Sequence, residues 1–226
     1  VVPSFLRRLE KDITKEYQSY LAQKGERLSP LVKKFVGEQE GTKIKEAKVR
    51  LVEYDPEGEE KVITGILFSA PQNHASWNEI FERVRKMGMD DKKHIIGEYL
   101  HGRTARWQRV GRAFENVYVR FEIITNIGAW RDLHRHRMLT HQRQDFSCHH
   151  GYETPPELMT AGLEKEYKSA IERVENLFYK VSRQNPFVSQ YCVTLAHRLR
   201  FMQWQNLRSL FWTSELRTIP EGHPDY

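Results

Sequence analysis

Apolar residues recur at helical spacing in the first part of the chain. One stripe at every fourth position consists of Phe5, Leu9, Ile13, Tyr17 and Leu21. Residues four apart share a helix face, so we expect an amphipathic helix over residues 3–23 that ends near Gly25. A second helix is expected from Ser29 to about Gly37, because Ser29 suits the N-cap and Pro30 the first helical position. These helices predict an N-terminal helical extension, residues 1–44.

Alternation with a period of two indicates strands further along. Residues 47–54 alternate in this way, and a turn sequence follows them at residues 55–58. Residues 61–67 are rich in β-branched side chains, which favours a strand, with a helix as the alternative. The clearest strand is 116–125, in which one face carries Val117, Val119, Phe121 and Ile123.

The second half of the chain shows mostly helical periodicity. Helices are expected at 76–87, 90–100, 127–136, 156–184, 187–204 and 205–217, with a polar loop running from 137 to Pro155. Strands early and helices late indicate an α+β class. We therefore expect one domain over residues 45–226 behind the extension.

Composition narrows the class of protein. The chain of 226 residues is 39% hydrophobic, which is ordinary for a packed globular protein. No stretch approaches the roughly 18 consecutive apolar residues of a membrane span. Two cysteines are too few for a disulfide framework, and we expect a cytoplasmic location. The chain begins with Val1 and shows no signal-peptide pattern, so either its true start lies upstream or it is a piece of a longer polypeptide.

Positive charge is concentrated in one window. Between His101 and Arg143 there are nine arginines, no lysine and three acidic residues, so this window carries the whole net charge of +6. Arginine forks favour bidentate recognition of phosphate or carboxylate. The sequence therefore predicts an anionic ligand.

Three segments carry a family resemblance. Arg135-His136-Arg137 follows the strand at 116–125, and the dipeptide Phe114-Glu115 precedes it. Downstream the chain reads Asn206-Leu-Arg208-Ser-Leu210 and then Leu216-Arg217, and residues 49–54 resemble a first strand. In this order, over residues 48–217, these segments resemble the flavin-dependent thymidylate synthases.

The resemblance implies an antiparallel sheet with helices and a homotetramer that binds FAD at subunit interfaces. It implies transfer of a one-carbon unit from methylenetetrahydrofolate to dUMP, giving dTMP, with NADPH reducing the flavin. Arg217 matches the catalytic position, where a permanent cation stabilises an electron-rich uracil. The residues implied to bind the cofactor are Arg135, His136, Arg137, Asn206, Arg208 and Glu115. The residues implied to bind the pyrimidine nucleotide are Arg131, Gln142 and Arg143.

Several positions depart from the family pattern. Asp132 stands where the family has Gln, Gln142 where it has Asn, and Arg143 where it has Glu. Asp145 and Ser147 replace a Ser and an Arg. A carboxylate beside a nucleotide weakens binding unless it is paired. We therefore expect reduced activity on dUMP.

Three other interpretations stand beside this one. In the first of them, the chain is a non-catalytic FAD- or nucleotide-binding homologue that forms one half of a longer enzyme. Alternatively, Trp107 among the arginines of residues 101–112 indicates a nucleic-acid-binding patch, although we expect no nucleic acid. Finally, Arg217 is a dipole-stabilising residue at a helix C-terminus. The histidines at 134–150 lack the spacing of zinc ligands, so no metal is expected.

Overall fold

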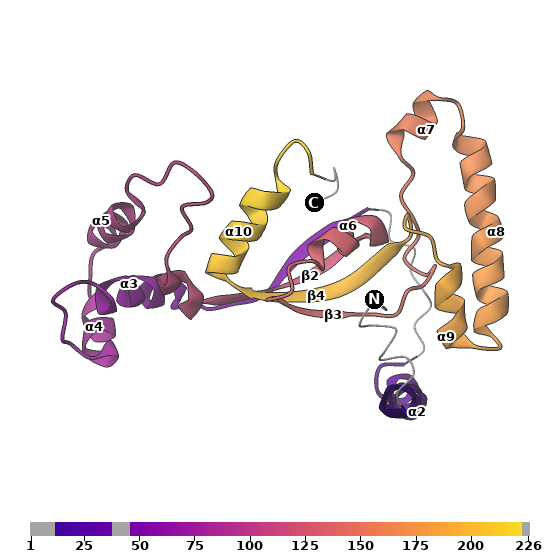
Figure 1. Ribbon diagram of the computed structural model, residues 1–226, viewed down its shortest axis with the longest axis horizontal. Coiled ribbons are helices and arrows are strands. Elements are labelled where there is room, and N and C mark those ends of the chain that lie inside the picture. Colours follow the sequence, from indigo (N-terminus) through magenta and orange to yellow (C-terminus); the bar gives the residue numbers. More distant parts are fainter. Residues whose placement is uncertain (1–11, 38–45, 223–226) are drawn as a thin grey trace, which may run out of the picture. The chain divides into compact units, whose positions relative to one another are not determined.

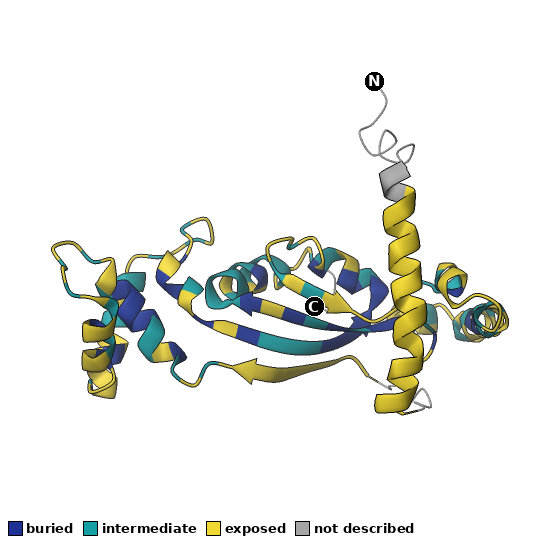
Figure 2. Ribbon diagram, turned by 90° about the horizontal axis from the view of Figure 1, so that it is seen from below, coloured by how far each residue is buried: buried dark blue, intermediate teal, exposed yellow. Residues whose placement is uncertain are grey.

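The computed structural model describes residues 12–37 and 46–222. The chain divides into two compact units, Val1–Thr42 and Lys43–Tyr226. In the first unit, α2 (Asp12–Phe35) is one helix, exposed along its described length (Figure 2). The expected break at Gly25 and the helix start at Ser29 are therefore wrong. The left-handed conformation that ends a helix occurs at Gly37, with φ of 88°, and not at Gly25. The predicted helical residues 3–11 lie outside the described residues.

The second unit contains an antiparallel sheet. Its strands are β1 (Lys48–Tyr54), β2 (Tyr118–Asn126), β3 (Thr140–Arg143) and β4 (Arg198–Asn206). They lie in the order β1-β2-β4-β3 (Figure 1). The α+β class and the strands predicted at 47–54 and 116–125 are confirmed.

Two strands were missed. β4 falls where we expected a helix at 187–204, and that expectation is wrong. Leu199, Phe201 and Gln203 are buried on one face of β4 while Trp204 is 40% exposed, which is the period-two pattern of a strand. β3 falls in the expected polar loop, because a four-residue polar edge strand has no apolar alternation to recognise.

Helices lie beyond both ends of the sheet (Figure 1). At one end are α3 (Gly58–Phe68), α4 (Trp77–Val84) and α5 (Met89–Leu100). The prediction of a strand at 61–67 is wrong, and the alternative prediction of a helix is correct. Val62, Ile63 and Ile66 form a buried helical face. At the other end are α7 (Pro156–Thr160), α8 (Glu164–Ser182), α9 (Pro186–Ser189) and the 3₁₀ turn η2 (Gln190–Cys192).

Two helices follow directly from the central strands. α6 (Ile127–Leu133) continues β2, and α10 (Leu207–Arg217) continues β4. Asn126 and Asn206 cap them, each side chain accepting a 2.8 Å hydrogen bond from the backbone N–H three residues later. α6 ends at Leu133, so the prediction of a helix to His136 was too long. Arg135-His136-Arg137 forms turns just beyond α6.

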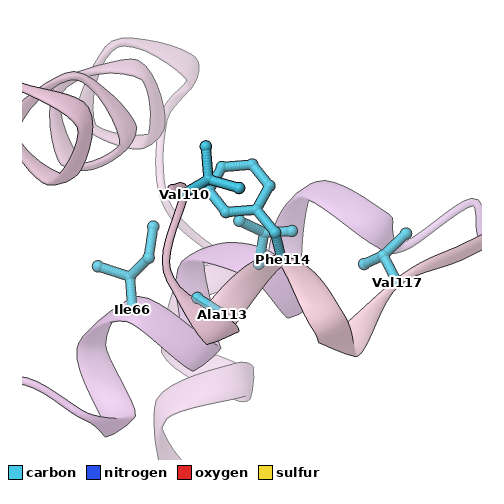
Figure 3. Packing of buried hydrophobic residues seen from close by; sticks show 6 residues of the cluster. Ile66, Val110, Ala113, Phe114 and Val117 are labelled. Carbon is cyan, nitrogen blue, oxygen red and sulfur yellow. The ribbon is translucent and has the colours of Figure 1, made fainter. Parts of the chain in front are cut away.

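Two hydrophobic clusters fix this arrangement. On one face of the sheet, Trp130 and Leu133 of α6 pack with Leu199 and Phe201 of β4. The second cluster joins α3 to the 3₁₀ helix η1 (Arg112–Asn116), and Figure 3 shows its members Ile66, Val110, Ala113, Phe114 and Val117. Full burial of a valine, isoleucine or phenylalanine side chain contributes about 1.5–3 kcal/mol to stability. Both ends of η1 are thereby held in place.

Candidate functional site

A cavity of about 730 Å³ is lined by six of the nine arginines in the window 101–143 and by Arg208. We call it the arginine cleft. Its guanidinium groups belong to Arg103, Arg106, Arg109, Arg112, Arg135, Arg137 and Arg208. Glu115 and Glu215 also line it, so seven cations stand against two carboxylates. The cleft is strongly electropositive, as expected for an anion-binding site.

All the residues implied to bind the cofactor line this cleft. They come from the turns after α6, from η1 and from the start of α10: Arg135, His136, Arg137, Glu115, Asn206 and Arg208. The structure thus brings together three sequence segments that are far apart in the chain.

Asn206 contributes through its position at the beginning of α10. Its side chain is occupied by the cap to the Ser209 N–H, and the Leu207 N–H donates to the Val117 carbonyl at 2.9 Å. Asn206, Arg208 and Ser209 all line the cleft, so the N-terminal turn of α10 faces it. The positive end of the helix dipole adds to the arginine charge.

Glu115 holds two of the arginines. It accepts a 2.6 Å hydrogen bond from Arg208 Nη1 and a 2.9 Å bond from Arg112 Nε. Arg208 is also fixed by a 2.9 Å bond from its Nε to the Val110 carbonyl. Burial alone would raise the pKa of Glu115, but the bonds from Arg112 and Arg208 outweigh it and lower the pKa. Glu115 is therefore a carboxylate that positions guanidinium groups.

Arg217, the implied catalytic residue, does not line the cleft itself. Its Nε donates to His136 Nε2 at 3.0 Å, and its Nη2 donates to the Asp132 carbonyl at 2.8 Å. Burial, and then the charge of Arg217, lower the pKa of His136. Because Nε2 accepts, neutral His136 carries its proton on Nδ1. Arg217 therefore contacts the cleft lining indirectly, by its hydrogen bond to His136, which lines the cleft.

The three residues implied to bind the pyrimidine nucleotide lie away from the cleft lining. Arg131 is exposed on α6, and Gln142 is exposed on β3. Arg143 lies 4.2 Å from the centre of the Phe146 ring and donates to the Gln144 carbonyl at 2.8 Å. These three side chains do not converge with the cofactor set.

The two unusual aspartates each have a cationic partner. Asp132 Oδ1 lies 3.2 Å from Arg135 Nη1, and Asp145 Oδ1 lies 4.0 Å from Arg143 Nη1. The first pair brings negative charge close to the cleft, while Asp145 is 85% exposed. Asp132 is thus compensated, which the sequence alone did not establish.

Sequence reasoning also missed part of the lining. Tyr118 of β2 and Glu215 and Trp212 of α10 line the cleft. The Arg109 guanidinium lies 4.9 Å from the centre of the Trp212 ring. The signal for the loop wall was present, because Arg103, Arg106, Arg109 and Arg112 recur at three-residue spacing.

Across residues 12–37 and 46–222, no group of three or more His, Cys, Asp or Glu side chains is arranged to hold a metal ion. Within the same ranges, no helix combines the length and apolar character needed to cross a bilayer.

Comparison with known proteins places these features in a family. Residues 50–226 match the model of the family described as thymidylate synthase complementing protein. A UPF0159 protein of Chlamydia pneumoniae is 38% identical over 178 residues, which cover 79% of this chain and 33% of that protein. A UPF0159 protein of Chlamydia muridarum is 30% identical over 239 residues, covering 100% of this chain and 42% of the relative. For one from Thermoplasma acidophilum the identity is 32% over 182 residues, with 79% and 36% covered.

The chain therefore spans about a third to two-fifths of the length of these relatives. The family match covers most of the chain and the Arg135-His136-Arg137 segment that carried the resemblance. The chain belongs to the thymidylate synthase complementing protein family.

Proposed function

We propose that this chain binds FAD in the arginine cleft and takes part in forming dTMP from dUMP. Methylenetetrahydrofolate would donate the one-carbon unit and NADPH would reduce the flavin. The observation that carries the proposal is the convergence of all six implied cofactor residues on one cationic cleft. Family membership supports the same chemistry.

The cleft has the properties that FAD requires. Its volume of about 730 Å³ lies within the usual range of ligand pockets. Seven guanidinium groups suit a pyrophosphate, and Tyr118, Phe211 and Trp212 offer aromatic surface to a flat ring system. Bound flavin, once reduced by NADPH, would supply the hydride that methyl-group formation consumes.

The residues of the chain divide this work. Arg137 is exposed in the cleft, while Arg135 is held by Asp132, so Arg137 has more freedom to bind phosphate. His136 presents a neutral ring whose Nε2 accepts from Arg217, which leaves Nδ1–H as its donor group. To stabilise a uracil, Arg217 would have to direct an N–H toward the substrate from the position in which its bonds to His136 and to the Asp132 carbonyl hold it.

A second candidate function is supported by the same geometry. Arg217 is engaged within the protein, and the three implied nucleotide residues lie outside the cleft lining. The relatives are also more than twice as long as this chain. These observations favour a non-catalytic FAD-binding homologue that serves as one half of a longer enzyme.

Titration of purified protein with FAD, followed by flavin fluorescence, tests binding. Replacement of Arg135 and Arg137 by Ala should weaken binding, because each charge-assisted bond contributes about 1.5–3 kcal/mol. The matched control is Arg183→Ala, an exposed arginine just after α8 and outside the cleft. Equal FAD affinity in the double variant and the control would refute the assignment.

Turnover distinguishes the two candidates. Deuterium-labelled dUMP is incubated with FAD, NADPH, methylenetetrahydrofolate and either the wild type or Arg217→Ala. We expect weak dTMP formation, or none, from this chain alone. A rate typical of the family, abolished by Arg217→Ala, would exclude the non-catalytic candidate.

We further propose a homotetramer and a family domain that follows an N-terminal extension at residues 1–44. β1, at the edge of the sheet, exposes Val49, Leu51 and Tyr54, an apolar surface that suits a subunit interface. The family match begins at residue 50, which supports the extension. Light scattering at micromolar concentration tests the assembly, and a monomer with bound flavin would contradict it.

A further inference from the structure

The arginines of the cleft fall into two groups by their partners. Four have carboxylate partners: Arg103 with Glu215, Arg112 and Arg208 with Glu115, and Arg135 with Asp132. In the described part of the chain, Arg106, Arg109 and Arg137 form no ion pair. Positive charge that is not neutralised internally is therefore concentrated on the loop before η1 and on the turn after α6.

The loop arginine Arg109 is held in a defined orientation. Its guanidinium lies 4.9 Å from the centre of the Trp212 ring, on α10. Contact with an aromatic face leaves the N–H edges of a guanidinium able to donate to a ligand. Arg106 faces the same region, because its charge contributes, after the hydrogen bond from Arg103, to the lowered pKa of Glu215.

The loop that carries both residues, 101–111, is ordered by its own hydrogen bonds. Gln108 Oε1 accepts from the N–H groups of Thr104 and Ala105, both at 2.8 Å. Arg103 Nε donates to the Gln108 carbonyl at 2.6 Å. Arg103 Nη2 also binds Glu215 at 2.6 Å, which ties the loop to α10. Arg103 and Gln108 are thus positioning residues, and the ligand-binding charge is left to Arg106 and Arg109.

We propose that Arg106 and Arg109 form a subsite for an anionic phosphoryl group on the loop wall of the cleft. The inference deepens the proposed function and rests on it for the identity of the ligand. The phosphoryl group belongs to the FAD pyrophosphate or to the dUMP phosphate, and both present the same chemistry. Two forked cations on an ordered loop match this charge and geometry.

Single-stranded nucleic acid is the rival ligand for this loop. Trp107 is 76% exposed and follows Arg106 directly, which suits base stacking beside a cation. The arrangement favours the phosphoryl group, because Arg106 and Arg109 line the cavity and Trp107 does not. The cationic side chains are thus directed to a ligand in the cleft.

Inorganic pyrophosphate is the probe for the subsite itself. Isothermal titration at low ionic strength compares the wild type with Arg106→Gln/Arg109→Gln and with the control Arg183→Gln. Loss of affinity should be about tenfold per guanidinium removed, and the control should bind as the wild type does. Gln108→Ala keeps every charge and should still weaken binding, since it disorders the loop. Circular dichroism confirms that each variant is folded.

Separate titrations with FAD and dUMP identify the source of the phosphoryl group. A loss for FAD alone assigns the subsite to the pyrophosphate, and a loss for dUMP alone assigns it to the nucleotide phosphate. If the wild type binds neither nucleotide but the loss for pyrophosphate persists, the proposed function fails and the subsite stands. Pyrophosphate affinity in the double variant within about twofold of the wild type overturns the subsite. So does tight oligonucleotide binding that Trp107→Ala abolishes and pyrophosphate does not displace.

Discussion

Replacing Glu115 by Gln tests whether this residue holds the cleft arginines or contacts a ligand. The variant keeps the size of the side chain and removes its charge. The bond to Arg208 joins side chains that are 28% and 33% exposed, so we assign it about 1.5 kcal/mol, the low end for a charged bond. The bond to Arg112, which is 84% exposed, contributes about 0.3 kcal/mol.

The expected loss of stability is therefore about 1–2 kcal/mol. For a protein of this size, that lowers Tm by about 2–8 °C. Thermal unfolding followed by circular dichroism measures the shift. The matched control is Glu172→Gln, an exposed glutamate on α8 for which no change is expected.

The stabilisation of the folded state by ionised Glu115 depends on pH in a defined direction. The folded state lowers the pKa of Glu115 from 4.5, so its stabilisation is fully present above 4.5. It is lost as the pH falls through the folded pKa. The difference between wild type and variant should be constant near neutrality and shrink in acid. An unchanged Tm, or a difference that persists in acid, would refute the role of Glu115 as the holder of Arg208.

Two further predictions concern the edges of the cleft. Arg217→Met should raise the pKa of His136, because a neighbouring cation that opposes protonation is removed; an NMR titration of the ring protons measures this, and an unchanged or lower pKa would contradict it. Gly111→Ala places a methyl group against the Tyr99 hydroxyl and 2.6 Å from its Cζ, so we expect a loss of about 1–3 kcal/mol in urea unfolding, partly restored by Tyr99→Leu. Wild-type stability in Gly111→Ala would show that Tyr99 moves aside without cost.

The sequence predicted the strands that carry apolar alternation and missed those that do not. β2 was recognised because valine, phenylalanine and isoleucine alternate along it. In β4 the buried face continues with Gln203 and Gln205, which are polar, so the apolar alternation is too short to predict a strand from the sequence. Burial of those glutamines depends on tertiary packing, which no local pattern encodes.

In the candidate site, too, the sequence predicted some features and tertiary packing decides the others. Residues in matched motifs, such as Arg137 and Arg208, were found because their order in the chain is distinctive. Whether each is neutralised is a property of the fold: Glu215 reaches Arg103 from 112 residues away. The sequence therefore predicted the charge of the site, while the structure distinguishes arginines that are held from those that are available.

The position of Arg217 follows from the sheet. β2 and β4 are antiparallel, and each ends in an asparagine that begins a helix, so α6 and α10 start at opposite ends of the sheet. Both lie on the same face in Figure 1, and their C-terminal ends meet where Arg217 donates to the Asp132 carbonyl. A cation at two helix C-termini is favoured by both dipoles.

Moving Arg217 toward a ligand therefore costs those dipole contacts as well as bonds of about 1.5–3 kcal/mol each. In the proposed reaction, a uracil oxygen that carries little charge would not offset this cost, whereas one that becomes anionic would. The same bonds that withhold Arg217 from the resting cleft would thus make its contribution selective for the charged form of the substrate.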